Sequence, residues 1–376
     1  MKPREVPAES LLARKLFHVD LASVRPSLEG RVVMVTGAAG SIGSALCREI
    51  AACGPRKLVC ADRNNSPLNA LHSEISAGTP NIDTVRFQAD VGDREQMTKC
   101  FAMHRIDFVF HAAADKHVPQ LETKVRETVA NNVLALATLL DVADEHACRG
   151  FVLISSDKAV NPASVMGATK RAGELILATR PLRTMRCVSV RFGNVIGSSG
   201  SVIPIFQEQL RLGLPLTITD SSARRFFMTS GEAVALVLKA FTMGQHGDIL
   251  VLDMGESVRT VDLANKLIQE SGAPEPAGKF KYIGLRAGEK LEEELFFDDE
   301  RVVATSCREI RRVRRARGSW PVLVRQIEAL RAALATEDSA AIRARLKQIV
   351  PEYTSARSRS SNNQLETLEE IPPRHS

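Results

Sequence analysis

Short runs of apolar, often β-branched residues recur through the first half of the chain, each followed by a polar turn and a helix-like stretch. Such runs are typical of strands that lie buried on both faces of a parallel sheet. The predicted strands cover residues 31–36, 57–61, 84–89, 107–110, 150–154 and 186–191, and the predicted helices between them cover residues 44–52, 66–77, 94–103, 121–147 and 165–179. This alternation predicts an α/β fold of the Rossmann type, a doubly wound parallel sheet with right-handed crossovers.

The regular alternation covers only part of the chain, which predicts separate regions. We expect residues 1–30 to form a polar N-terminal arm and residues 31–195 to form the Rossmann domain. Residues 196–318 have looser spacing, and we expect mainly a smaller C-terminal substrate lobe over the carboxyl ends of the strands, with some segments returning to the sheet. Ser319 is a candidate helix N-cap with Pro321 early in the helix, so we expect C-terminal helices over residues 319–353. The polar composition of residues 354–376 predicts a disordered tail.

A glycine-rich turn joins the first predicted strand to the first predicted helix. Gly37, Gly40 and Gly43 are each three residues apart, and such glycines permit a tight turn and a close approach of the backbone to a pyrophosphate at a helix N-terminus. Asp62 follows about 20 residues later at the end of the second strand, where a carboxylate accepts hydrogen bonds from an adenosine ribose. The turn could also exist without a ligand, but Asp62 favours a dinucleotide site.

The choice between NAD and NADP depends on the residues next to Asp62. A guanidinium at Arg63 could meet the 2′-phosphate of NADP, whereas Asp62 would repel it, so we expect NAD and keep NADP possible. Asp90 ends the third strand and is placed to meet the adenine edge. The full set of expected cofactor-binding residues is Gly37, Gly40, Ser41, Ile42, Gly43, Asp62, Arg63, Asp90, Val91, Ala112 and Lys170.

The strand at 150–154 ends in the sequence Ser155-Ser156-Asp157-Lys158. We expect an exposed carboxyl group and amine here, facing the crevice at the carboxyl ends of the strands. Met166 and Lys170 follow four residues apart on the predicted helix 165–179, so their side chains share one face. The plain alternative for Asp157 and Lys158 is a solvated ion pair at a loop edge.

These motifs resemble the extended short-chain dehydrogenases/reductases and, more narrowly, the CapD-like polysaccharide-biosynthesis family, which includes UDP-N-acetylglucosamine 4,6-dehydratases. The matching stretches are residues 35–43, 111–119, 154–162, 165–170, 190–204, 227–229 and 284–290. The resemblance implies an NAD(P)-dependent nucleotide-sugar 4,6-dehydratase, a lyase that converts UDP-N-acetylglucosamine or a close relative to a 4-keto-6-deoxy sugar for surface polysaccharide. The expected partner is therefore a UDP-sugar substrate.

The same resemblance assigns catalytic roles to four residues. Asp157 is expected to be the acid that protonates the departing C6 oxygen, and Lys158 the base at C5. Such a base has to be neutral, and burial would lower the pKa of Lys158. Ser156 is the candidate for handling the proton of the 4-hydroxyl, and Lys170 is expected to contact the nicotinamide ribose.

One position departs from the superfamily pattern in a way that bears on activity. The usual catalytic tyrosine is replaced by Met166, whose thioether is a weak acceptor and cannot act as the base. Long-chain members of the resembling family often carry Met at this position and are expected to be active. Two alternatives nevertheless stay open: a UDP-sugar 4-epimerase, which needs no acid–base pair at C5 and C6, and a catalytically inactive NAD-binding interaction protein.

The substrate contacts are expected mostly in the lobe. Arg225 and Arg286 are the candidates to clamp a diphosphate, because a guanidinium matches phosphate oxygens in a planar fork. Glu289 is the candidate to accept from a uridine ribose hydroxyl. Asp115 stands where the family usually has tyrosine, which leaves the exact sugar open. The expected substrate-binding residues are Lys116, His117, Asn194, Arg225, Arg286 and Glu289, and His111 is expected to pack or to bond to backbone.

Composition adds mainly exclusions. The net charge of +6 is weak evidence for nucleic acid, and none is expected as a partner. The 7 cysteines are scattered, which favours free thiols and a cytoplasmic location. We expect no metal, since no cluster has ligand spacing, and no transmembrane segment.

The arginines between residues 308 and 317 predict a solvated basic segment or, alternatively, a peripheral contact with a membrane or an acidic partner. A homo-oligomer is expected by analogy with the superfamily.

Overall fold

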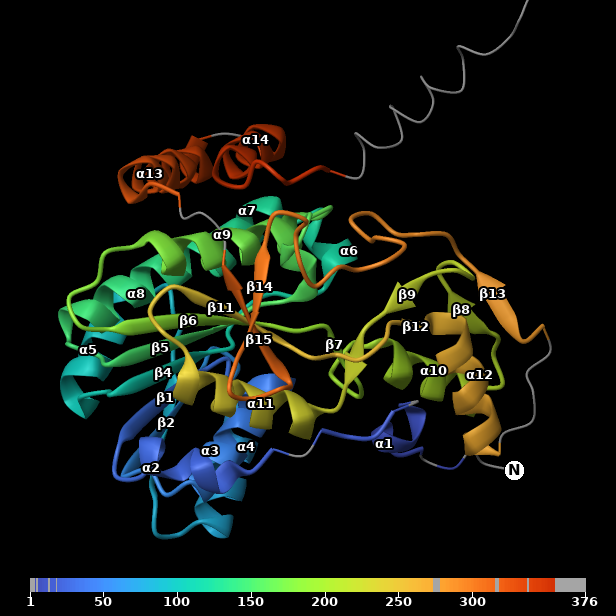
Figure 1. Cartoon of the computed structure of the whole chain (residues 1–376), viewed down its shortest axis with the longest axis horizontal. Helices are drawn as coiled ribbons and strands as arrows, with labels where there is room; N and C mark the ends of the chain where they lie inside the picture. The colour runs from blue at the N-terminus through green and yellow to red at the C-terminus, as the bar shows by residue number, and fades with distance from the viewer. Residues whose placement is uncertain are drawn as a thin grey trace, which may run out of the picture.

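A nine-stranded sheet with helices on both faces forms the centre of the molecule (Figure 1). The computed structural model describes residues 4, 6–12, 14–17, 19–272, 278–314, 318–336 and 338–355. The strand order is β14-β15-β11-β6-β5-β4-β1-β2-β3. The expected tail therefore lies almost wholly outside the described residues, since these end at Ser355.

Seven neighbouring strands of this sheet run parallel, from β11 to β3. They are β1 (Val32–Thr36), β2 (Lys57–Asp62), β3 (Asp83–Gln88), β4 (Phe108–His111), β5 (Gly150–Ile154), β6 (Arg186–Arg191) and β11 (Asp248–Leu252). At one edge β15 (Ile310–Arg314) runs antiparallel to both β11 and β14 (Arg301–Ala304). The predicted Rossmann-type α/β fold is confirmed, and the three strands at one edge of the sheet, β11, β14 and β15, come from far along the chain.

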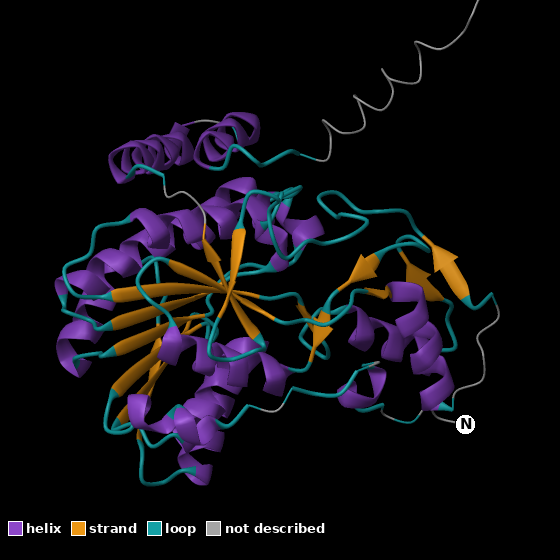
Figure 2. Ribbon diagram, in the orientation of Figure 1, coloured by secondary structure: helices purple, strands orange, loops and turns teal. Residues whose placement is uncertain are grey.

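Helices cover the two faces of the sheet in separate layers (Figure 2). Alternate residues of β1 point to opposite sides, so that Val33 belongs to one apolar core and Met34 to the other. One core includes residues of α2 (Arg25–Leu28), α3 (Ser41–Ala52), α4 (Asn65–Gly78) and α11 (Ser230–Met243). The other includes residues of α5 (Arg94–His104), α7 (Val125–Val129), α8 (Ala135–Glu145) and α9 (Val165–Thr179).

The stretch expected as one helix over residues 121–147 is broken into several pieces. A short α6 (Val118–Leu121) comes first, and α7 and α8 are separated by a π-helical turn, η2 (Ala130–Leu134). Within that turn the Asn132 side chain accepts from the backbone N–H of Asp115 and donates to the Thr169 hydroxyl. The wider turn thus ties this layer to the loop after β4, which apolar spacing alone does not predict.

Two C-terminal helices, α13 (Trp320–Thr336) and α14 (Ser339–Ile349), pack as a hairpin outside α7 and α9 (Figure 1). Their apolar side chains, including Leu330 and Leu346, are buried in the same core as the helices beneath them. The hairpin is fastened at its far end, where Arg343 donates to the Glu122 carboxylate at 2.7 Å.

The lobe is built on a smaller apolar core. Its elements are α10 (Val202–Arg211), α12 (Thr260–Ser271), β8 (Leu216–Ile218) and β13 (Phe280–Tyr282), with the short strands β7 (Asn194–Val195), β9 (Arg224–Arg225), β10 (Phe227–Met228) and β12 (Val258–Arg259). The arm joins both cores through α1 (Ala8–Leu11) and η1 (Leu21–Ser23). Leu11 is buried in the lobe and Leu28 against the sheet, so the arm is less polar in its contacts than its composition predicts.

The basic stretch near residue 310 is only partly solvated, which corrects the expectation. Residues 310–314 form β15 and are held between two other strands. Arg312 pairs with Asp248 at 2.9 Å and donates to the Met243 carbonyl. The ion pair of Arg312 thus holds β15 against the neighbouring elements. Arg308, in contrast, is exposed as expected. Residues 315–317 lie outside the described residues.

Candidate active site

The glycine turn lies at the carboxyl end of β1 and leads into α3. Gly37 has φ +66, and a Cβ there would lie 2.5 Å from the backbone nitrogen of Ala113. A Cβ on Gly43 would lie 1.9 Å from the Gly37 carbonyl oxygen, so glycine is needed to bring α3 against the turn. Gly40 caps α3 without a side-chain hydrogen bond. The N–H groups of the first helical turn are therefore available to an anion.

Asp62 lies against this turn from the end of β2. Its buried carboxylate accepts from the backbone N–H groups of Ala39 at 3.0 Å and Asn64 at 2.8 Å. The structure therefore brings together the glycine turn and the carboxylate that the sequence pairs. This arrangement fits a dinucleotide, with its pyrophosphate at the α3 N-terminus and a ribose beside Asp62.

The other expected cofactor residues occupy different surroundings along the same edge. Asp90 is exposed after β3 and accepts from the Gly92 N–H, while Val91 is buried. Ser41 accepts from the Ser199 N–H at 3.0 Å, so its hydroxyl meets the lobe side. Ala112 and Ile42 are partly buried against the sheet core.

Arg63 is engaged by the residue that departs from the family pattern. Its guanidinium lies 2.8 Å from the Asp115 carboxylate, across the loops after β2 and β4. Asp115 is in turn fixed by the Asn132 side chain. A guanidinium paired in this way has less attraction for a 2′-phosphate, which favours NAD over NADP.

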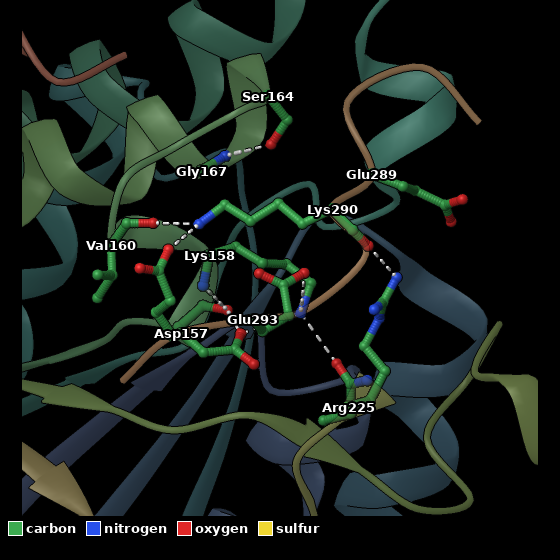
Figure 3. A network of polar contacts seen from close by, with 12 residues as sticks. Asp157, Lys158, Val160, Ser164, Gly167, Arg225, Glu289, Lys290 and Glu293 are labelled. Carbon is green, nitrogen blue, oxygen red and sulfur yellow. Dashed lines mark hydrogen bonds and ion pairs between the residues drawn. The ribbon is translucent and has the colours of Figure 1, made fainter. Parts of the chain in front are cut away.

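The residues after β5 form a compact polar cluster (Figure 3). Asp157 Oδ1 accepts from the Ser156 hydroxyl at 2.8 Å and from Lys158 Nζ at 2.9 Å. Lys158 Nζ also donates to Asn194 Oδ1 at 3.0 Å. The expectation of an exposed pair is wrong: the Asp157 side chain has no exposed surface, and that of Lys158 keeps 19%. The lobe contributes Asn194 and Glu293 to the cluster, which removes the pair from water.

Glu293 is the residue that sequence reasoning missed. It stands 3.6 Å from Lys158 Nζ through Oε1, and its side chain is only 4% exposed. Its other oxygen, Oε2, and Oδ2 of Asp157 are both buried, and neither has a hydrogen-bond partner among the residues that the structure describes. In the sequence, Glu292-Glu293-Glu294 is a run of three acidic residues, which is typical of a solvated segment. Only the fold shows that the middle residue, Glu293, is buried.

The charges in this cluster overturn the expected direction of the Lys158 pKa. Burial does lower that pKa, but the carboxylates of Asp157 and Glu293 outweigh it and raise the pKa above its usual value. Burial raises the pKa of Glu293, against the opposing charge of Lys158. Lys158 is therefore an ammonium ion in the resting protein.

Lys170 and Met166 lie on the first turns of α9, with contrasting surroundings. Lys170 Nζ donates to the Ile154 carbonyl at 2.9 Å, and burial lowers its pKa to about 8. Met166 is 3% exposed and packs with Val118 and Leu121 of α6. The thioether is thus part of an apolar contact, in line with a packing role.

A buried ion network supports the strand that carries the pair. Ser155 donates to the Glu174 carboxylate at 2.7 Å, and Glu174 also binds Arg191 at 2.8 Å and Arg171 at 3.1 Å. Arg191 reaches Glu300 at 2.9 Å on its other side. Because these charges are buried and mutually paired, they fix the carboxyl ends of β5 and β6 relative to α9.

The expected substrate residues form two separate groups. Asn194 joins the Lys158 cluster, and Arg225 donates to the carbonyl oxygens of Lys290 and Leu291 (Figure 3). Arg286 instead pairs with Glu289 at 2.7 Å. A cavity of about 500 Å³ opens in the lobe just beyond β7, lined by Val6, Pro7, Ile196, Gly197, Ile203, Pro204 and Gln207.

Three residues after β4 complete the set. Lys116 is exposed, and the His117 ring lies against Gly200, where a Cβ would come within 2.3 Å of it. The His111 side chain is buried and packs beside Phe151, as one of the two expected alternatives predicts, and its ring shares a hydrogen bond of 2.8 Å with the Thr36 hydroxyl and not with backbone. Burial lowers its pKa to about 3, which leaves it neutral.

Two further findings concern metal and membrane. Among the described residues, no group of three or more His, Cys, Asp or Glu side chains could hold a metal ion. Within the same residues, every helix is too short or too polar to cross a bilayer. All 7 cysteines are free thiols.

The fold and the site define a class: a Rossmann-type α/β protein with a dinucleotide-type turn and a polar cluster where the lobe meets the sheet. The chain belongs to the family described as polysaccharide biosynthesis protein, which it matches over residues 33–315. It is 42% identical over 328 residues to the probable polysaccharide biosynthesis protein EpsC of Bacillus subtilis, covering 86% of this chain and 55% of that protein. It is 40% identical over 300 residues to the capsular polysaccharide biosynthesis protein CapD of Staphylococcus aureus, covering 79% of this chain and 50% of CapD. The chain thus spans about half the length of these relatives.

Other relatives carry enzyme names. A UDP-glucose 4-epimerase of Rickettsia conorii is 33% identical over 288 residues, covering 75% of this chain and 82% of the epimerase. The X-ray structure of Pen from Bacillus thuringiensis superposes with a TM-score of 0.71 at 28% identity, covering 78% of this chain and 92% of Pen. DesIV, a dTDP-glucose 4,6-dehydratase of Streptomyces venezuelae solved with NAD and TYD, shares the fold with a TM-score of 0.63 at 22% identity, covering 70% and 88%. The chain is therefore similar in sequence to proteins named UDP-glucose 4-epimerase and shares its fold with a dTDP-glucose 4,6-dehydratase.

Proposed function

We propose that this protein is an NAD-dependent 4,6-dehydratase that removes water from UDP-N-acetylglucosamine or a close relative, giving a 4-keto-6-deoxy sugar for surface polysaccharide. The observation that carries the proposal is the carboxyl–amine pair Asp157–Lys158, joined at 2.9 Å at the carboxyl end of β5. Loss of water across C5 and C6 needs an acid and a base next to each other, and this pair supplies both.

The residues around the glycine turn fit NAD. The first turn of α3 would hold the pyrophosphate, Asp62 a ribose, and Lys170 the nicotinamide ribose. When bound, NAD supplies a hydride acceptor for C4 of the sugar and a hydride donor for C6. The Arg63–Asp115 pair supports NAD over NADP, because Asp115 already neutralises the guanidinium.

The proton transfers are assigned to the cluster after β5. Ser156, whose hydroxyl donates to Asp157, carries the proton of the 4-hydroxyl to that carboxylate. The resulting carboxylic acid protonates the C6 oxygen as water leaves. The Lys158 amine takes the C5 proton and later returns it to C5. Lys158 is the member of the pair with exposed surface, so the sugar approaches from its side.

The nucleotide part of the substrate is assigned to the lobe. Arg225 and Arg286 would bind the diphosphate, Glu289 a ribose hydroxyl and Asn194 the sugar phosphate. In the resting protein these side chains bond to the protein itself, Arg225 to carbonyl oxygens and Arg286 to Glu289. Substrate therefore replaces existing hydrogen bonds, so each contributes less affinity than a free guanidinium would.

A UDP-sugar 4-epimerase is the second candidate, since a UDP-glucose 4-epimerase is 33% identical over 75% of this chain. Epimerisation requires hydride transfer at C4 but no proton transfer at C5 and no loss of the C6 oxygen. In that reaction Asp157 would still take the proton of the 4-hydroxyl through Ser156, but Lys158 would have no C5 proton to remove, which favours the dehydratase.

The two functions give products of different mass. The purified protein is incubated with UDP-N-acetylglucosamine and NAD, and the sugar nucleotide is examined by mass spectrometry and proton NMR. A product lighter by one water, with a C6 methyl signal, supports the dehydratase. An isobaric product supports the epimerase, and unchanged substrate together with measurable NAD binding supports an inactive binding protein.

A further inference from the structure

Glu293 has the surroundings of a group that exchanges protons. Its Oε1 stands 3.6 Å from Lys158 Nζ, while Oε2 is buried and has no hydrogen-bond partner in the part of the chain that the structure describes. A buried carboxylate oxygen left unpaired costs free energy, about 1–3 kcal/mol or more. A purely structural carboxylate would be expected to use both oxygens, as Glu174 does with Ser155, Arg191 and Arg171.

The proton count of the proposed reaction needs such a group. In the resting pair, Asp157 accepts a hydrogen bond from the ammonium of Lys158. After the proton of the 4-hydroxyl reaches Asp157, both members of the pair carry a proton. The acid for the C6 oxygen is then ready, but Lys158 has no free electron pair for the C5 proton. One proton has to leave Lys158 before the elimination.

We propose that Glu293 accepts that proton from Lys158 once the sugar is bound, and returns it at the end of the cycle. This inference rests on the proposed dehydratase function. Its balance closes: neutral Lys158 takes the C5 proton, the acid at Asp157 protonates the C6 hydroxyl, and one water leaves. Lys158 then returns the proton to C5, and Glu293 restores the ammonium. Glu293 acts through Lys158 and is a positioning residue in this scheme.

The charged groups around Glu293 come from several elements and set its affinity for a proton. Asp157 from η3 (Asp157–Ala159) adds to the rise of the Glu293 pKa, whereas Lys158, Arg225 from β9 and Lys290 oppose that rise. A diphosphate bound by Arg225 would neutralise one of these cations. The pKa of Glu293 would rise further, so binding of the nucleotide would itself favour transfer of the Lys158 proton.

The test uses Glu293→Gln, which keeps the shape of the side chain, with Glu292→Gln as a matched control at an exposed neighbouring position. We expect kcat for Glu293→Gln to fall by about 10²-fold or more, with KM changed less. The loss should be partly recovered at alkaline pH, where Lys158 enters the cycle already neutral. The control should keep the wild-type rate and pH profile.

A second measurement does not depend on turnover. The pKa of Lys158 is read from the pH dependence of its modification by an amine-reactive reagent, followed by mass spectrometry of the peptide that contains it. In Glu293→Gln this pKa should fall, because a carboxylate that raises it has been removed. It should stay unchanged in Glu292→Gln.

The possible outcomes distinguish a failure of the Glu293 proposal from a failure of the proposed dehydratase function. A wild-type protein that forms no dehydrated product overturns the proposed function, and this inference with it. A normal wild type, combined with a Glu293→Gln variant that keeps its rate, overturns the inference alone. The inference alone is also overturned if Glu293→Gln is slower but keeps the wild-type pH profile and an unchanged Lys158 pKa. Glu293 would then only support the structure.

Discussion

Single residues decide whether this family member can be an enzyme, because the expected phenol is missing. Met166 packs against Val118 and Leu121 and has no proton to give. The polar groups lie on the neighbouring loop after β5, where Ser156, Lys158 and Asp157 are joined through one carboxylate oxygen. In the proposed dehydratase, the catalytic groups therefore lie at the strand end and not at the helix position where the superfamily keeps its tyrosine.

Variants at these two places should behave differently. Asp157→Asn is expected to lower kcat by about 10²- to 10⁴-fold, because the acid for the C6 oxygen is lost. Met166→Ala removes only apolar contacts, so its main effect should be a loss of stability of about 2–5 kcal/mol or less. Steady-state kinetics and urea unfolding measure the two effects. Equal losses of kcat would mean that the thioether does more than pack.

Cofactor choice is the other property set by single residues. The Arg63 guanidinium lies 2.8 Å from Asp115. Asp115→Asn should release it and strengthen NADP binding by roughly threefold to tenfold, a modest gain because Arg63 is half exposed to solvent. Isothermal titration with NAD and NADP measures the change, and Arg63→Ala in the same background should cancel it. Equal changes for both cofactors would contradict a role in discrimination.

At the scale of elements, regular spacing predicted the strands and helices of the sheet well, and irregular pieces poorly. Residues 150–154 and 165–179 form the predicted strand and helix without change. Residues 121–147 contain a π-helical turn, in which the Asn132 side chain forms hydrogen bonds with Asp115 and Thr169. Such contacts between distant residues leave no trace in the spacing of apolar residues, so the turn was not predicted. Residues 310–314 form a strand although three of the five are arginine, since Arg312 has a buried partner in Asp248.

The α13–α14 hairpin is the element whose role is most open to test. The hairpin packs over α7, η2 and α9 and buries Leu330 in the core beneath it. Arg343 pairs with Glu122, whose carboxylate also accepts from the Val165 N–H at the start of α9. Leu330→Ala should lower the free energy of unfolding by about 2–5 kcal/mol. Chemical unfolding checks this, with Val322→Ala as the exposed control. A loss no larger than that of the control would mean that the hairpin is not packed as described.

At the scale of the whole molecule, the site exists only where the lobe closes over the sheet. The glycine turn, Asp62 and the pair after β5 were predictable because each ends a regular strand. The contacts between Lys158 and Asn194 or Glu293 were not, because they join residues about 36 and 135 positions apart in the chain through the fold of the lobe. That same closure buries the pair and reverses the expected direction of the Lys158 pKa.

The central claim, that Asp157 and Lys158 remove water from a sugar nucleotide, is tested most directly in deuterium oxide. UDP-N-acetylglucosamine is incubated with the wild-type protein, and the product is examined by proton NMR. We predict a C6-deoxy product with deuterium at C5, because Lys158 exchanges the proton it carries with solvent. Lys158→Ala should bind NAD and give no such product. A product that keeps its C6 oxygen and its C5 proton, or full turnover by Lys158→Ala, would contradict the claim.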